Sequence, residues 1–295
     1  MELLAVTGIE HEEQRSLIDF SRLEGNLESL RDQYQAADPY PHIVLDDFLP
    51  ASAAEAAESE FPPLDPGQWN NYLHINERKF SNTDPESWGP TLQTILAELN
   101  SPRFVQFISA LIGVPGLIAD PSLEGGGLHQ STTGGFLNIH ADFTVHPHNR
   151  NWQRRANILL YLNSDWKSEY GGDLELWSPD MERCVERVQP VINRVLIFTT
   201  DPTSYHGHPE PMRCPEGIAR RSLALYYFSV EDDPLVRSTE YRSRPGDGLR
   251  SVPIYADKQM LRLYDWSKRR LGVSDQAASK LLGLRERIRR RSSPE

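Results

Sequence analysis

The sequence lacks a long uninterrupted hydrophobic run and has little cysteine. Its most apolar stretch, residues 104–118, is broken by polar residues and by Pro115, whereas a membrane-spanning helix needs about 20 consecutive apolar residues. The amino terminus lacks the basic start of a signal peptide. The two cysteines, Cys184 and Cys214, form neither a C-x-x-C motif nor a disulfide framework. We therefore expect no membrane span and a cytoplasmic location.

Basic residues are outnumbered, except at the carboxyl end. The chain has 31 Lys and Arg against 42 Asp and Glu, for a net charge of −11. Residues 268–295 carry a charge of +6, which leaves −17 on the remainder. Because neutralising phosphates requires a basic face, we expect no nucleic-acid partner. We interpret the basic tail as a solvated amphipathic helix, with an interaction tail as the alternative.

The order of sequence patterns predicts the fold class. With 295 residues the chain can bury a large core. Helical spacing of apolar residues occurs at 10–37, 51–61, 90–99, 102–113 and 257–291. Strand-like runs bounded by turn residues occur at 39–50, 135–140, 156–162, 173–177, 194–199 and 222–230. Residues 64–90 are rich in Asn, Pro and Asp and predict a long loop. Helices followed by many short strands indicate an α+β fold with a mainly β core.

Histidines and a carboxylate lie in the strand region. His140 and Asp142 end one run, and residues two apart on a strand share a face. A third ligand on another strand comes from the Tyr-His-Gly-His segment, as His206 or His208. Two histidines and one carboxylate on one face of a metal form the facial triad of non-haem Fe(II) oxygenases. This pattern predicts an iron centre.

Several motifs occur in a fixed order between residues 134 and 228. They are Gly-Gly-Phe-Leu-Asn-Ile-His140-Ala-Asp142, Tyr161-Leu-Asn-Ser-Asp-Trp166, Gly171-Gly-Asp-Leu-Glu-Leu-Trp177, Asn193-Arg-Val-Leu-Ile-Phe-Thr, Tyr205-His206-Gly-His and Arg220-Arg221-Ser-Leu-Ala-Leu-Tyr-Tyr-Phe228. Together they resemble the Fe(II)- and 2-oxoglutarate-dependent dioxygenases, in particular the prolyl-hydroxylase-like branch. The resemblance covers about a third of the chain. It implies a double-stranded β-helix (jelly roll) with helices packed on one side.

The resemblance also implies an organisation of the chain. Residues 1–115 form a helical part with an entry strand, packing on the core. Residues 116–232 form the double-stranded β-helix, which carries the chemistry. Residues 233–295 form a carboxyl-terminal extension with the basic helix. The three parts are expected to make one structural unit.

The resemblance implies His140, Asp142 and His206 as iron ligands, with His208 as the alternative to His206. In the family that the sequence resembles, an arginine at the start of the last core strand binds the distal carboxylate of 2-oxoglutarate, and Arg220 and Arg221 compete for this role. We favour Arg221, because alternation from it gives the more apolar interior filling. Tyr161 resembles the tyrosine that donates its hydroxyl to the same carboxylate.

The implied activity is hydroxylation of an unactivated C–H bond of an amino acid, a peptidyl residue or a small metabolite. The implied cofactors are Fe(II), 2-oxoglutarate as co-substrate and O₂, with ascorbate in vitro; succinate and CO₂ are released. A non-enzymatic jelly-roll binding module is the alternative, and desaturation or cyclisation on the same scaffold is another.

Three further segments have weaker indications. His129 and Gln130 precede the triad strand, where the family places substrate or co-substrate contacts. His146 and His148 lie in a polar segment that we interpret as a solvated lid. Residues 64–90 and 143–155 are expected to wall the substrate site.

Overall fold

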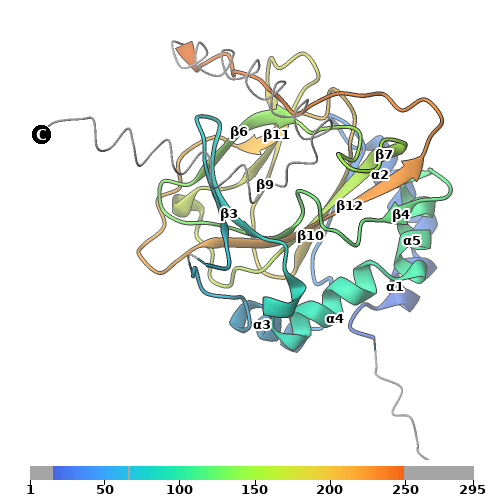
Figure 1. The fold of residues 1–295 in the computed structure, drawn as a ribbon, viewed down its shortest axis with the longest axis horizontal. Coiled ribbons are helices and arrows are strands. Elements are labelled where there is room, and N and C mark those ends of the chain that lie inside the picture. The colour runs from blue at the N-terminus through green and yellow to red at the C-terminus, as the bar shows by residue number, and fades with distance from the viewer. Residues whose placement is uncertain (1–15, 66, 249–295) are drawn as a thin grey trace, which may run out of the picture.

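The computed structural model describes residues 16–65 and 67–248. Its helices surround one side of a large sheet (Figure 1). The α-helices are α1 (Phe20–Gly25), α2 (Leu27–Ala36), α3 (Ala51–Ser59), α4 (Pro90–Leu99) and α5 (Pro102–Ile112). Two 3-10 turns are η1 (Pro85–Ser87) and η2 (Ser168–Tyr170). In the described part of the chain no helix is long and apolar enough to cross a membrane.

Within residues 16–65 and 67–248, thirteen antiparallel strands form one continuous hydrogen-bonded sheet. They are β1 (His42–Leu45), β2 (Asn70–Leu73), β3 (Glu77–Asn82), β4 (Ile118–Ala119), β5 (Gly127–Ser131), β6 (Phe136–Ala141), β7 (Trp152–Tyr161), β8 (Leu174–Trp177), β9 (Cys184–Val188), β10 (Arg194–Thr199), β11 (His206–His208), β12 (Arg220–Val230) and β13 (Glu240–Tyr241). The main path runs β1-β10-β7-β12-β5-β3-β6-β11-β8-β9. The α+β fold with a mainly β core is confirmed.

Strand β3 connects the two halves of this sheet. Its residues 80–82 pair with β5, and its residues 77–78 pair with β6. The first half of the path, β1 to β5, faces the helices, whereas β6, β11 and β9 lie away from them (Figure 1). The sheet thus folds over on itself as a barrel-like double layer, with an interior between its two halves.

The two faces of the first half pack against different partners. One face forms a hydrophobic core with the helices, in which Leu223, Leu225 and Tyr227 of β12 meet Leu99 and Phe104. The other face lines the interior, where a smaller cluster holds Tyr161, Leu174, Leu176, Leu196 and Phe198. Alternation along each strand therefore divides its side chains between a helix-covered core and a site-bearing interior.

Helix α5 shows how local sequence sets the helical layer. The Ser101 side chain accepts a hydrogen bond from the Phe104 amide at 3.2 Å, and proline occupies the first helical position. The helix ends at Gly113, whose φ of +75° is the left-handed conformation that glycine accommodates. Phe104, Phe107, Ile108 and Leu111 share one face and are buried, and the Phe104 ring contacts Tyr227 of the sheet.

The structure corrects the interpretation of residues 64–90 as a loop. Residues 70–82 form the β2–β3 hairpin, and β3 is the strand that joins the two halves of the sheet. A strand also appears beyond the expected end of the core, because β13 pairs with β6. The expected helix at 257–291 and the basic tail lie outside the described residues.

Candidate active site

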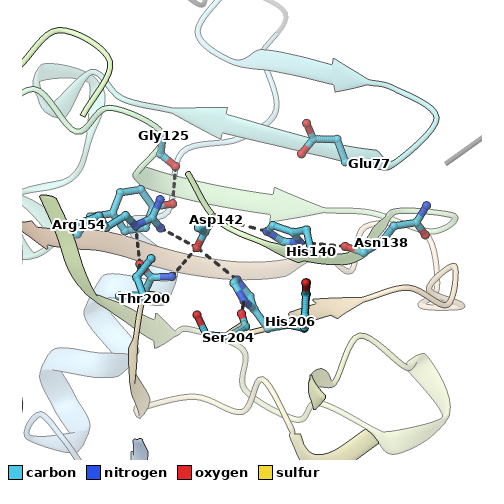
Figure 2. Close-up of polar contacts among 12 residues, drawn as sticks. Glu77, Gly125, Asn138, His140, Asp142, Arg154, Thr200, Ser204 and His206 are labelled. Carbon is cyan, nitrogen blue, oxygen red and sulfur yellow. Dashed lines mark hydrogen bonds and ion pairs between the residues drawn. The ribbon is translucent and has the colours of Figure 1, made fainter. Parts of the chain in front are cut away.

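His140, Asp142 and His206 come together in the barrel interior (Figure 2). His140 lies near the end of β6, directly opposite His206 at the start of β11. The His140 Nε2 atom is 3.6 Å from one Asp142 carboxylate oxygen, and the His206 Nε2 atom is 3.5 Å from the other. One ligand atom from each residue lies within 4.8 Å of the other two. His208 is not a member of this group. The structure therefore unites the three predicted ligands.

Hydrogen bonds to the backbone orient both imidazoles. The His140 Nδ1 atom lies 2.9 Å from the Asn138 carbonyl oxygen, and the His206 Nδ1 atom lies 2.9 Å from that of Ser204. Because a carbonyl only accepts, each Nδ1 carries the hydrogen and each Nε2 presents its lone pair. Burial, together with nearby His140, lowers the pKa of His206 to about 4. Nitrogen lone pairs and a carboxylate thus face one another, and a divalent cation fits that donor set.

The Arg154 side chain reaches the Asp142 carboxylate from the other side (Figure 2), and Asn157 also donates a hydrogen bond to it. The Arg154 Nη2 atom donates at 2.9 Å and the Asn157 Nδ2 atom at 2.7 Å, both to the same oxygen. Burial alone would raise the pKa of Asp142, but Arg154 and the two imidazoles hold it well below its usual range. The carboxylate is therefore ionised at neutral pH, as metal ligation requires.

A β-bulge in β7 places Arg154 in the interior. The register between β7 and β12 shifts at Arg155, so Arg154 and Asn157, three positions apart, both face Asp142. Regular alternation would send them to opposite faces. The Arg154 guanidinium also lies 3.3 Å from the centre of the Tyr226 ring, a favourable cation–π contact.

The structure corrects the choice of arginine, because Arg220 and not Arg221 points into the interior. Arg220 is 6% exposed; its Nε atom donates to the Gly172 carbonyl at 2.7 Å and its Nη2 atom to the Tyr161 hydroxyl at 3.3 Å. Arg221 is on the opposite face of β12, where its guanidinium lies over the ring of Phe61 at 5.4 Å.

The error came from assigning the more apolar face of β12 to the barrel interior. The residues on the same face of β12 as Arg221 are indeed the more apolar set, but they pack on the helices. The residues on the same face as Arg220 include Ser222 and Tyr226, which line a polar interior. The face of β12 that points into the barrel is the more polar one because the barrel interior holds a charged site. The more apolar face is covered by the helices instead.

Tyr161 and two further histidines lie beside Arg220. Burial raises the pKa of Tyr161, although nearby Arg220 opposes this, so the phenol stays protonated and can donate. Burial, reinforced by Lys79 and Arg220, lowers the pKa of His129 to about 3. Burial and Arg220 likewise hold the pKa of His208 well below its usual range. These groups surround an arginine, and the binding roles of Tyr161 and of the arginine remain predictions.

Sequence reasoning missed three residues of the site. Arg154 and Asn157 were not singled out, although Asn157 lies four positions before Tyr161 and so shares its face. Tyr241 comes from β13, outside the region of resemblance, and its ring lies 5.3 Å from that of His140. No pattern in the sequence indicates that β13 returns to the metal site.

Comparisons with known proteins agree with this site. Residues 126–228 match the family model described as the 2OG-Fe(II) oxygenase superfamily. The chain is 24% identical over 234 residues to "Prolyl 3-hydroxylase OGFOD1" of Mus musculus. The aligned region covers 78% of this chain and 39% of that protein. The chain thus spans well under half the length of this relative.

Solved structures resemble the fold. A prolyl 4-hydroxylase from Phytophthora capsici superposes with a TM-score of 0.50 and 18% identity, over 95% of this chain and 92% of that one. A Pseudomonas putida prolyl-4-hydroxylase gives 0.49 and 20% identity, over 69% and 99%. The Phytophthora likeness supports the jelly-roll fold.

Fold and site together resemble those of the non-haem iron oxygenases built on a jelly roll. More particularly, the match over residues 126–228, with the histidine–aspartate–histidine triad inside it, supports a 2OG-Fe(II) oxygenase of the prolyl-hydroxylase-like type. The resemblance predicted from the motifs is confirmed.

Proposed function

We propose that the protein hydroxylates an unactivated C–H bond of an amino acid, a peptidyl residue or a small metabolite, with Fe(II), O₂ and 2-oxoglutarate, releasing succinate and CO₂. The relatives named above are prolyl hydroxylases, so prolyl peptides are the first substrates to test.

The observation that carries this proposal is that Arg220 is buried in the interior and donates to Tyr161 and Gly172 but to no carboxylate that the structure describes. Among the described residues, no carboxylate lies within ion-pair distance of the Arg220 guanidinium; Asp173 is half-buried nearby, and burial raises the pKa of its carboxyl. A buried cation without an acid partner is costly unless an anion joins it. A metal site and an unpaired arginine in one interior suit a co-substrate that carries two carboxylates.

Each residue has a distinct role in this proposal. Bound iron would supply the oxidising chemistry, held by His140, Asp142 and His206. Arg154 and Asn157 keep the Asp142 carboxylate ionised and oriented through their hydrogen bonds.

At the far end, Arg220 and Tyr161 would bind the distal carboxylate of 2-oxoglutarate. The hydrogen bond from the Arg220 Nη2 atom to the Tyr161 hydroxyl holds the guanidinium and the phenol side by side. Both groups could then donate to the same carboxylate. Two donors at fixed positions would set how far the co-substrate reaches from the metal.

A non-enzymatic jelly-roll binding module is the competing function. A sugar- or peptide-binding module gains nothing from a buried set of metal-ligand atoms beside an unpaired arginine, so the described site favours an enzyme.

The test is turnover of the purified protein with Fe(II), ascorbate and 2-oxoglutarate, against prolyl peptides, pooled amino acids and cell extract. We expect succinate release coupled to a product 16 Da heavier than its substrate. Protein without added iron is the control. If 2-oxoglutarate neither binds the metal-loaded protein nor gives succinate with any of these pools, the proposed function is wrong.

A further inference from the structure

His208 is a buried histidine in the barrel interior that the triad does not use. It lies two positions after His206 on β11 and so points to the same side of that strand. The residue is 4% exposed, and its Nδ1 atom is buried without a hydrogen-bond partner among the described residues. Such an unpaired buried polar atom is uncommon in folded proteins and calls for an explanation.

A second imidazole in the same interior shows the same feature. His129 lies on β5 directly opposite Ser222 of β12, which is on the same face as Arg220. The Nε2 atom of His129 is buried and also has no hydrogen-bond partner in the described part of the chain. Two unpaired ring nitrogens on separate strands thus occur in the interior that contains Arg220.

The charges around His208 indicate what could join it. After burial, Arg220, Lys79 of β3 and His140 of the triad each lower the pKa of His208, so all three lie near it. Lys79 already has a carboxylate partner, Glu77, at 3.1 Å. Arg220 has none. His208 therefore lies in the field of both the unpaired arginine and the metal triad, which are the two ends of the proposed co-substrate site.

We propose that His208 is a co-substrate-positioning residue, whose Nδ1–H donates to the distal carboxylate that Arg220 and Tyr161 bind. This inference rests on the proposed function. A carboxylate has about four acceptor positions and takes donors from several directions. Arg220 and Tyr161 approach from β12 and β7, and His208 approaches from β11 in the other half of the sheet. With a donor from each half, the site would discriminate in favour of keto acids that carry the distal carboxylate.

The side-chain geometry offers a matched pair of variants. In His208→Asn the amide nitrogen takes the place of Nδ1, so the donor is retained. In His208→Leu a side chain of similar bulk has no donor. Because a hydrogen bond to a charged group is lost, we expect His208→Leu to weaken 2-oxoglutarate binding by about 10- to 100-fold. His208→Asn should stay within about threefold of the wild type.

The experiment is calorimetric titration of full-length Mn(II)-loaded protein with 2-oxoglutarate and, separately, with 2-oxopentanoate, which lacks the distal carboxylate. His208→Leu should weaken the binding of 2-oxoglutarate and leave that of 2-oxopentanoate unchanged, with Mn(II) affinity also unchanged. His208→Asn is the control for the substitution itself and should bind both acids within about threefold of the wild type.

Two results would overturn the inference. Equal losses for the two keto acids would show that His208 acts through the metal end or through general packing. Wild-type affinity for 2-oxoglutarate in His208→Leu would show that Nδ1 makes no contact with it. Absence of 2-oxoglutarate binding by the wild-type protein is a different result, because it contradicts the proposed function and not the role of this histidine alone.

Discussion

The Asp142 carboxylate interacts with four other side chains of the site. It accepts two hydrogen bonds from Arg154 and Asn157 while facing the Nε2 atoms of His140 and His206. One side chain thus connects the metal position to the cationic interior. Changes at this residue should separate effects on the metal from effects on stability.

We predict that Asp142→Ala abolishes iron-dependent succinate formation, because one of three metal ligands is lost. It should still fold, but with a lower free energy of unfolding by about 2–4 kcal/mol, since the buried Arg154 guanidinium loses its partner. Denaturant melts and succinate assays measure the two effects. Adding Arg154→Leu should recover part of the stability and none of the activity. Full activity in Asp142→Ala would remove Asp142 from the ligand set.

At the co-substrate end, we predict that Arg220→Ala raises the dissociation constant for 2-oxoglutarate by at least about tenfold. Arg221→Ala should change it little, because that side chain lies over Phe61 on the helix-facing side. Tyr161→Phe should fall between them, since it removes one hydrogen bond to a charged group. Titration of the anaerobic Fe(II) protein, followed by its charge-transfer band, gives all three constants. A damaging Arg221→Ala beside a silent Arg220→Ala would contradict the strand orientation described above.

At the scale of structural elements, two connecting segments are joined by a buried pair. His146, expected to be solvated, is 2% exposed, and its Nε2 atom lies 3.4 Å from the Asp120 carboxylate. Its Nδ1 atom accepts hydrogen bonds from the backbone amides of His148 and Asn149. Exposure was predicted for His146 and His148, and of these two residues only His148 is exposed. The segment after the triad strand is therefore anchored to the segment after β4, not free in solvent.

The Asp120 carboxylate should make stability depend on acid pH. Burial alone would raise the pKa of Asp120, but the contact with His146 and the hydrogen bonds from the Ser122 hydroxyl and two backbone amides lower it below its usual value. A lowered pKa means that the folded state binds fewer protons than the unfolded state. Its stabilising contribution is therefore complete at pH values above the unfolded pKa of about 3.9 and declines as the pH falls through the folded value.

We predict that Asp120→Asn lowers the free energy of unfolding by about 1–3 kcal/mol at pH 7, because it removes the charge that these donors satisfy. The difference from the wild type should shrink as the pH falls below 4. Urea melts at several pH values measure it, with Asp233→Asn, at an exposed carboxylate, as the control. A deficit that stays constant down to pH 2 would show that the charge of Asp120 is not what stabilises the contact.

Sequence patterns located most of the helices and strands, but they did not show which strands pair with one another. Helix α4 lies at 90–99, as predicted, since its apolar spacing and opening proline are local signals. The β2–β3 hairpin was missed because β3 contains Glu77, Lys79 and Asn82, which do not resemble a buried strand. Such residues suit β3 because it closes the sheet beside a charged interior, a role that depends on strands far away in the sequence.

At the scale of the whole molecule, helices and sheet share one core. Residues from α1 to α5 pack with β7, β10 and β12 in a single cluster, so the helical layer supports the strands that carry Asn157, Tyr161 and Arg220. The site also draws on β13, which follows the last long strand. The division of the chain at 115 and 232 stays a prediction.

The basic tail gives a prediction for the whole chain. Residues 268–295 lie outside the described residues and outside the family match, which ends at residue 228. We expect deletion of 281–295 to leave succinate formation within about threefold of the full-length protein, because no residue of the described site comes from it. Loss of iron-dependent turnover in a well-folded truncated protein would show that the tail contributes to the site.

The sequence by itself determined the features that depend on near neighbours. His140 and Asp142 are two positions apart at the end of a strand, so their shared face follows from the strand repeat. The order of the motifs likewise identified the family. The tertiary structure alone decided which arginine enters the interior, because that depends on the face of β12 that the helices cover. It also decided that Arg154 reaches Asp142, since the bulge at Arg155 arises from pairing with β12 and alternation cannot reveal it.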